Sequence, residues 1–168
     1  MIDIGNPIPF FETKDQDGKT VKSTDLIGDK NLVLYFYPRN FTRGCTAQSC
    51  TFRDSIARFA SLDARIVGVS GDSPEGHRKF ISAHGLNFSL LADEDGSVRK
   101  AFGLKGILFG LIPSRSTFVI DKSGVIRFST THLGQSEAHV AEAKAALEAM
   151  RVAGEDFIRN PDAKNTLA

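Results

Sequence analysis

The sequence predicts an α/β domain in which a central mixed β-sheet carries helices on both faces. Short apolar runs rich in β-forming residues alternate with segments of helical spacing, and two turn-linked strands then precede a final alanine-rich helix. The 168 residues contain no internal repeat, low-complexity tract or interdomain linker, and a chain of this length buries a substantial core. We therefore expect one domain over residues 1–154 and a polar tail over residues 155–168.

The first half of the chain predicts a hairpin, two buried strands and an intervening helix. Residues 12–26 are polar, and Asp17-Gly18 within them supplies turn chemistry, so they predict an N-terminal β-hairpin. Residues 31–37 and 65–70 are continuous apolar runs, which indicates strands buried on both faces of the sheet. Between these strands, residues 44–62 carry apolar side chains near helical spacing and are expected to be helical.

The second half continues the alternation of helices and strands. Residues 73–85 predict a helix, because Ser73 is a suitable N-cap, Pro74 suits the first helical position and Gly85 suits the end. The other expected elements are a strand over 86–93, a short helix over 96–103, an irregular apolar loop over 104–113, two strands over 116–130 with a turn at 122–124, and a helix over 136–152 capped by Ser136.

Composition and charge exclude several classes of partner. The net charge is +1 at pH 7, so no bulk attraction to nucleic acid or to an anionic membrane is expected. No apolar stretch approaches the ~20 residues of a membrane-spanning helix, and the first residues lack the basic and long apolar regions of a secretory signal. A close cysteine pair in a reducing cytosol indicates a catalytic, redox-sensing or metal-binding role rather than a structural one. We expect a cytoplasmic protein.

Both cysteines lie in one polar segment that directly follows the buried strand over residues 31–37. Sites in α/β folds form at the carboxyl ends of the strands, which is where this segment begins. A helix starting near Thr42 would be capped by the threonine hydroxyl and would place Cys45 in its first turn. Unpaired N–H groups and the positive end of the helix dipole favour an anion there, so the pKa of Cys45 is expected to lie below its usual value of about 8.5. The thiolate that results is a nucleophile.

Cys50 follows five residues later on the same predicted helix. Ideal helix geometry separates the two α-carbons by roughly 8.6 Å, whereas a disulfide needs them within about 7 Å. The two sulfurs therefore cannot bond while the helix is intact, and bonding requires its first turns to unwind. The C-x4-C spacing predicts a conformational switch.

The residues around these cysteines resemble a known family. Pro38-x-x-x-Thr42-x-x-Cys45 is similar to the signature of the peroxiredoxins, and Cys50 at the fifth position after Cys45 resembles the atypical two-cysteine type called bacterioferritin comigratory protein or peroxiredoxin Q. The similarity covers roughly residues 6–150. It includes four further segments in the same order and at similar spacing: 51–54, 67–80, 86–96 and 115–126.

The resemblance implies a thioredoxin-like fold and a thiol peroxidase that needs no cofactor and no metal. It implies that Cys45 is the peroxidatic cysteine and that Cys50 is the resolving cysteine, which condenses with the sulfenic acid to an intramolecular disulfide. Thr42 would hydrogen-bond the thiolate and the peroxide, Arg115 would stabilise the thiolate and polarise the O–O bond, and Pro38 would shield the site from solvent. The implied partners are a hydroperoxide and thioredoxin or a similar dithiol reductant, in a monomer or homodimer that serves antioxidant defence.

The sequence departs from the family pattern at three places. Arg43-Gly44 replaces the usual proline-glycine before the peroxidatic cysteine, which places a cation near the helix start. Gln48 replaces the usual glutamate, and a neutral amide is expected to weaken the hydrogen-bond network to the arginine and to lower the rate. Residues 104–114 are more apolar than the subfamily pattern, which is compatible with a hydrophobic substrate groove or a subunit interface.

Two other functions remain open at this point. A redox-regulated binding protein would use the disulfide to unwind a helix and expose a partner site, whereas a general disulfide oxidoreductase is disfavoured because the spacing is C-x4-C rather than C-x-x-C. The cysteine and histidine spacings do not match common zinc sites. The four histidines are expected to be surface or capping residues without a catalytic role: His77, His84, His132 and His139.

Overall fold

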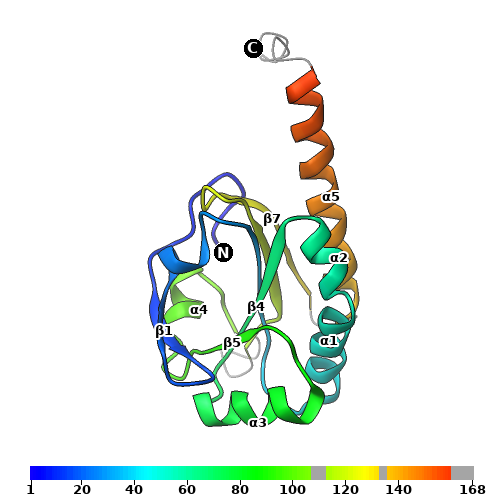
Figure 1. Ribbon diagram of the computed structural model, residues 1–168. Helices are drawn as coiled ribbons and strands as arrows, with labels where there is room; N and C mark the ends of the chain where they lie inside the picture. Colours follow the sequence, from blue (N-terminus) through cyan, green and yellow to red (C-terminus); the bar gives the residue numbers. More distant parts are fainter. Residues whose placement is uncertain (107–112, 133–135, 160–168) are drawn as a thin grey trace.

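The computed structural model describes residues 1–106, 113–132 and 136–159, and these residues form a seven-stranded mixed sheet in the order β2-β1-β5-β4-β3-β6-β7 (Figure 1). The strands are β1 Glu12–Asp15, β2 Thr20–Lys22, β3 Asn31–Phe36, β4 Ala64–Ser70, β5 Ser89–Ala92, β6 Ser116–Ile120 and β7 Ile126–Thr131. The helices are α1 Arg43–Asp54, α2 Ile56–Ser61, α3 Pro74–His84, α4 Ser97–Ala101 and α5 Ala138–Arg159, with a 3-10 turn over Ser23–Leu26.

The centre of the sheet is mixed, as the sequence predicts. Strand β4 pairs in parallel with both β3 and β5, whereas β6 runs antiparallel to β3. The parallel strands are connected by helices, and the antiparallel pair β6–β7 is joined by the predicted turn. The N-terminal hairpin of β1 and β2 is also confirmed and adds an antiparallel edge next to β5.

Alternate side chains of β3 enter two separate cores. Val33 and Tyr35 face one side, where they pack with α1, α2, α3 and α5, and Leu34 and Phe36 face the other side, where they pack with α4 and the N-terminal segment. Successive residues of a strand point to opposite faces, so one continuous apolar run supplies both cores. This arrangement explains why residues 31–37 show no alternation of polar and apolar residues.

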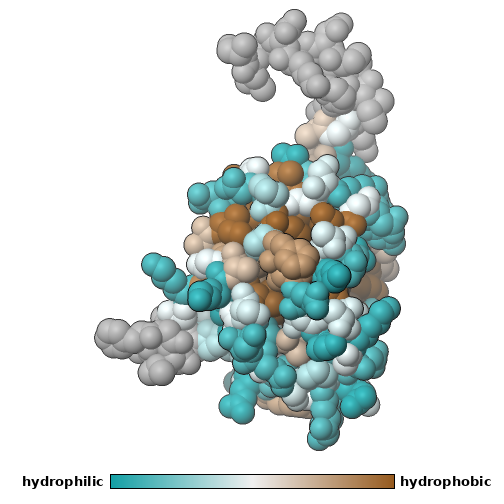
Figure 2. Space-filling view, turned by 90° about the vertical axis from the view of Figure 1, so that its left-hand side faces the viewer, coloured by the Kyte–Doolittle hydropathy of each residue, from teal (hydrophilic) through white to brown (hydrophobic). Residues whose placement is uncertain are grey.

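The N-terminal segment runs along the β1 side of the molecule, away from α1 (Figure 1). Ile4 is 57% exposed and Phe10 is 67% exposed on this segment. Figure 2 shows apolar surface in the middle of the face on that side, surrounded by polar side chains. The site built around α1 therefore lies elsewhere on the protein.

Three details of the helices differ from the sequence-based expectation. The helix expected over residues 44–62 is interrupted at Ser55, whose N–H donates to the carbonyls of both Thr51 and Phe52. Helix α5 begins at Ala138, so Ser136 does not occupy its N-cap, and the helix runs to Arg159, into the segment expected to be a polar tail. The division of the chain at residue 154 stays a prediction.

Two expectations concern stretches that the structure tests only in part. The apolar loop expected over 104–113 falls largely on residues 107–112, which lie outside the described residues. In the described part of the chain, no helix combines the length and the apolar character that crossing a membrane requires.

Candidate active site

Helix α1 begins where the sequence predicts, with Thr42 as its N-cap. The hydroxyl of Thr42 accepts a hydrogen bond from the backbone N–H of Cys45 at 3.4 Å and donates to the carbonyl of Arg39 at 3.3 Å. Cys45 thus lies in the first turn, near the N–H groups and the positive end of the helix dipole. Its side chain is buried, with 1% exposure. In this conformation the Thr42 hydroxyl contacts backbone atoms and not the sulfur.

Arg115 reaches Cys45 although 70 residues separate them in the sequence. Strand β6 pairs antiparallel with β3, with Ser116 opposite Phe36, so the residue before β6 lies beside the segment that follows β3. The Arg115 side chain, 6% exposed, donates from Nη2 to the Cys45 sulfur at 3.4 Å. The contact places a buried cationic donor directly beside the sulfur. The structure therefore brings together three of the predicted site residues.

Gln48 belongs to the same hydrogen-bond network. Its side chain is fully buried, and its carbonyl oxygen accepts a hydrogen bond from Nη1 of Arg115. The Gln48 amide nitrogen and the Nε of Arg115 have no hydrogen-bond partner among the described residues. The neutral side chain thus holds the arginine in place without adding a second negative charge near Cys45.

Gly44 leaves room for the arginine. A Cβ atom at this position would lie 3.3 Å from Nη2 of Arg115, which is closer than most Cβ contacts in proteins. An alanine here would require the guanidinium to shift by a few tenths of an ångström. The glycine is therefore part of the geometry that lets Arg115 contact Cys45.

We expect Gly44→Ala to lower the rate of reaction with peroxide by about threefold to tenfold, because small displacements of a positioning group have large kinetic effects. Stopped-flow measurement of thiol oxidation tests this expectation. Gly154→Ala is a matched control, because a Cβ there meets nothing within 4 Å. An unchanged rate in Gly44→Ala would show that the guanidinium tolerates the methyl group.

A buried aromatic cluster supports the helix from below. The hydroxyls of Tyr35 and Ser49 lie 2.9 Å apart, and the Tyr35 ring stacks on Phe52 at 4.6 Å between centroids. Burial raises the pKa of Tyr35 above its ordinary value, so its phenol stays neutral. These contacts connect the middle of α1 to β3 and so help to position Cys45 relative to the sheet.

Cys50 lies on the same helix as Cys45 and is half-buried, and both residues carry free thiols. Five residues of helix separate the two α-carbons by roughly 8.6 Å, beyond the reach of a disulfide. Pro38, also half-buried, lies two residues after the end of β3, and Arg43 is exposed at the first position of α1. Arg43 is thus a solvated cation and not a second contact to the sulfur.

The expectation that the histidines lie at the surface is wrong for His77 and His139, both of which are fully buried. The imidazole of His77 contacts Tyr37 and Asn40, which belong to the segment that leads to Cys45. A usable signal was present in the sequence, because His77 and Phe80 lie three residues apart and so share one face of α3. His139 accepts from or donates to Thr117 at 2.9 Å through Nδ1.

His139 makes the fold sensitive to acid. Burial lowers the pKa of His139 to about 4, below the value of about 6.5 for an unfolded chain. The unfolded state therefore takes up the proton first, and the stability contributed by neutral His139 is lost as the pH falls from about 6.5 to about 4. We expect this loss to reach up to about 3 kcal/mol in the free energy of unfolding.

Urea denaturation at pH 7.0 and pH 4.5 measures this effect. In His139→Gln the difference in unfolding free energy between the two pH values should shrink. An identical difference in the variant would assign the acid sensitivity to other groups. Burial also lowers the pKa of His77, so His77 contributes in the same direction.

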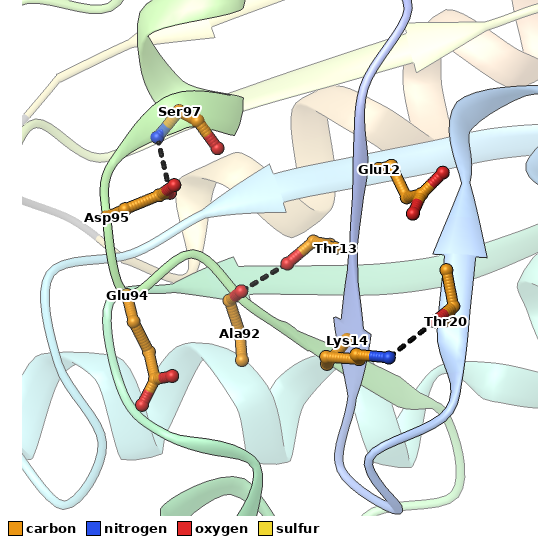
Figure 3. Close-up of a pocket in the computed structure, with 8 residues that line it drawn as sticks. All are labelled: Glu12, Thr13, Lys14, Thr20, Ala92, Glu94, Asp95 and Ser97. Carbon is orange, nitrogen blue, oxygen red and sulfur yellow. Dashed lines mark hydrogen bonds between the residues drawn. The ribbon is translucent and has the colours of Figure 1, made fainter.

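A separate cavity lies at the β1 edge of the sheet and contains none of the predicted site residues. Figure 3 shows that it is open between β1, β2 and the segment after β5, with Lys14 donating to Thr20 at 2.5 Å. Within the described ranges, no group of three or more histidine, cysteine, aspartate or glutamate side chains is arranged to hold a metal ion.

Comparison with known proteins identifies relatives over most of the chain. A model of the AhpC/TSA family matches residues 4–129. The chain is 42% identical to the chloroplastic peroxiredoxin Q of Populus jackii, covering 87% of this chain and 68% of that protein. It is also 42% identical to the chloroplastic peroxiredoxin Q of Sedum lineare, covering 88% of this chain and 78% of the relative.

Solved structures agree with the fold. The peroxidoxin BcpB of Mycobacterium tuberculosis superposes with a TM-score of 0.82 at 36% identity, covering 89% of this chain and 98% of that one. The bacterioferritin comigratory protein of Xanthomonas campestris, described for its alkyl peroxide reduction activity, superposes with a TM-score of 0.76 at 28% identity, covering 83% and 91%. The predicted thioredoxin-like fold of a peroxiredoxin is confirmed.

The expected cytoplasmic localisation is contradicted by these comparisons, because the matched peroxiredoxin Q relatives are chloroplastic proteins. The expectation relied on a cysteine pair that suits a reducing compartment and on the lack of a secretory signal. Neither feature distinguishes one reducing compartment from another, so the inference was wrong.

Proposed function

The chain belongs to the AhpC/TSA family, as a peroxiredoxin of the bacterioferritin comigratory protein and peroxiredoxin Q subfamily, and on that premise we propose a catalytic cycle that runs through Cys45 and Cys50. The family makes the chain a peroxidase that acts in antioxidant defence. The observation that supports this cycle best is the contact between Nη2 of Arg115 and the Cys45 sulfur at 3.4 Å, between two buried residues at the N-terminus of α1.

In the first step, the Cys45 thiolate attacks one oxygen of the hydroperoxide. The S–O bond forms as the O–O bond breaks, and the departing oxygen takes up a proton and leaves as water or an alcohol. The sulfur is oxidised to a sulfenic acid, and the peroxide is reduced by two electrons. Arg115 lies where negative charge moves from sulfur to oxygen, and fixed donors of this kind stabilise the transition state.

Thr42 and Pro38 have supporting roles in this step. The cap at Thr42 holds the first turn closed, and rotation of its hydroxyl away from the Arg39 carbonyl directs it toward the substrate. Pro38, half-buried at the end of β3, limits access of water to the sulfur. Both roles follow from the family resemblance and from the positions of these residues next to Cys45.

In the second step, the Cys50 sulfur attacks the sulfenic sulfur of Cys45. The S–S bond forms, the S–O bond breaks, and the hydroxyl leaves as water after protonation. The start of α1 must open for this step, because the intact helix keeps the two α-carbons too far apart. A dithiol such as reduced thioredoxin then exchanges with the disulfide, returns both cysteines to thiols and is itself oxidised.

Cys50→Ser separates the two steps. We expect the variant to consume its first equivalent of peroxide at nearly the wild-type rate and then to accumulate sulfenic or sulfinic acid, because no thiol remains to form the disulfide. Stopped-flow oxidation followed by mass spectrometry of Cys45 tests this result. Continued turnover at the wild-type rate with thioredoxin would exclude Cys50 as the resolving residue.

The same measurement on the wild-type protein tests the whole cycle. Several hydroperoxides are supplied with thioredoxin and its reductase, and peroxide consumption is followed together with the oxidation state of both cysteines. Fast consumption with a Cys45–Cys50 disulfide supports the cycle. A reversible disulfide with negligible turnover would instead favour a redox-switched binding protein, in which opening of α1 exposes a surface for a partner.

A further inference from the structure

Residues 38–42, which lie in the connection between β3 and α1, are held in place by helix α3 and by Asp72 before it. Figure 1 shows the end of α3 beside the start of α1, where Phe41 packs against Phe80 and His84. Hydrogen bonds join Asn40 to Asp72, which precedes α3, and to His77 in the first half of α3. Thr42 closes this segment and caps α1. Whatever fixes the segment therefore also fixes the first turn, in which Cys45 lies.

Asn40 is the centre of these contacts and is 6% exposed. Its backbone N–H donates to a carboxylate oxygen of Asp72 at 2.9 Å, and its side-chain oxygen accepts from the hydroxyl of Tyr37 at 2.7 Å. Its amide nitrogen lies 3.2 Å from Nδ1 of His77. The backbone N–H, the side-chain oxygen and the side-chain nitrogen of Asn40 therefore all have hydrogen-bond partners.

The hydrogen bonds of His77 fix its protonation state. Nε2 lies 3.0 Å from the carbonyl of Leu91, which can only accept, so Nε2 carries the proton. Nδ1 is then an acceptor for the Asn40 amide. Burial lowers the pKa of His77 and keeps this neutral form, against the opposite effect of the nearby Asp72 carboxylate. His77 therefore connects β5, α3 and the segment that carries the cap of α1.

Phe41 shows that the segment is under strain. Its φ of 61° lies in the left-handed region, which non-glycine residues rarely adopt. Its ring is 57% exposed and packs edge-on against Phe80 of α3, with 5.1 Å between centroids. Strained residues persist only where neighbouring contacts hold them, and here Asn40 supplies those contacts on one side and the cap at Thr42 supplies them on the other.

We propose that His77 is a positioning residue of the peroxidase reaction, which through Asn40 holds residues 38–42 in the conformation that keeps the first turn of α1 closed, and so sets how often Cys45 comes within reach of Cys50. The kinetic part of this inference rests on the proposed cycle. The closed segment favours attack on the peroxide, and its release favours disulfide formation. A more stable network thus favours the peroxide step, and a less stable network favours the disulfide step.

Three variants test this role. His77→Leu removes the side-chain contacts to Tyr37, Asn40 and Leu91 at similar volume. Asn40→Ala removes the connection from the other side, which keeps the test valid if His77→Leu fails to fold. His77→Gln retains a polar side chain that can accept from Asn40 and is expected to recover part of the wild-type behaviour. Phe102→Leu is the control, because Phe102 is fully buried in the core on the opposite face of the sheet.

The first readout is hydrogen exchange of the backbone amides of residues 40–46 in the reduced protein, without peroxide. We expect exchange about tenfold faster in His77→Leu and Asn40→Ala, an intermediate rate in His77→Gln and no local change in Phe102→Leu. The second readout is a single turnover with one equivalent of hydrogen peroxide. Oxidation of Cys45 should become slower and the subsequent Cys45–Cys50 disulfide should form about threefold to tenfold faster.

Exchange at residues 40–46 that rises no more in His77→Leu and Asn40→Ala than in Phe102→Leu would overturn the proposal. Faster local exchange with unchanged rates for both chemical steps would also overturn it. Hydrogen exchange needs no turnover, so a wild-type protein that fails to consume peroxide would refute the proposed cycle while the exchange result still decides whether His77 holds the segment.

Discussion

Cys45→Ser is expected to abolish peroxidase turnover, with a fall of at least about a thousandfold. The serine hydroxyl keeps its proton at neutral pH and is a far weaker nucleophile than a thiolate. The contact with Arg115 cannot compensate, because a guanidinium stabilises an anion only where one forms. Steady-state peroxide consumption with thioredoxin measures the loss.

The control for this experiment is Cys50→Ser, which removes a half-buried thiol from the same helix. Its first turnover should remain, as argued above, whereas Cys45→Ser should show none. Circular dichroism of both variants confirms that α1 and the sheet are intact. Residual first-turnover oxidation in Cys45→Ser would assign the peroxidatic role to Cys50, since the chain has two cysteines.

Arg115→Leu is expected to lower the rate of the peroxide step by about 10²–10³-fold. Its side chain supplies a buried donor to the sulfur at 3.4 Å and a second one to Gln48, and removal of one aimed donor at a site of developing charge has effects of this size. Arg115→Lys should recover only part of the rate, because an ammonium cannot donate in two fixed directions at once. Single-turnover oxidation at several pH values measures both effects.

Arg43→Leu is the matched control, because it removes a cation from the start of the same helix at an exposed position. Solvent and salt screen exposed charges, so we expect a change of less than about threefold. An equal loss in Arg43→Leu and Arg115→Leu would mean that overall positive potential, and not the direct contact, activates Cys45.

The sequence predicted the sheet well because its strands are buried on both faces. Residues 31–37 and 65–70 supply side chains to two cores at once, so their continuous apolar character is dictated by the fold. The α3 helix was equally predictable, since Ser73 accepts a hydrogen bond from the N–H of Gly76 and Gly85 ends the helix with a φ of 58°. These capping signals depend only on neighbouring residues, so they can be identified without knowing what the helix packs against.

The site was predictable only as far as its motif extends. Thr42 and Cys45 lie in one helix turn, and their relation follows from spacing. The contact between Arg115 and Cys45 depends on the pairing of β3 with β6, and it was expected from family resemblance and not from the residues. The roles of His77 and Asn40 were missed. The spacing of His77 and Phe80 indicates a shared helix face, but no local pattern in the sequence shows that this face meets Asn40, 37 residues away.

The alternation along β3 has a consequence for the durability of the enzyme. The cysteine, its helix and their aromatic support belong to the packing on one side of the sheet, whereas Phe36, Phe102 and Phe118 interlock on the other side with centroids 5.0–5.9 Å apart. If the start of α1 opens during the proposed cycle, this second layer has no direct part in the movement. The proposed cycle would then need only the Cys45 side of the sheet to rearrange, and the intact second core would provide the surface on which α1 folds again after reduction.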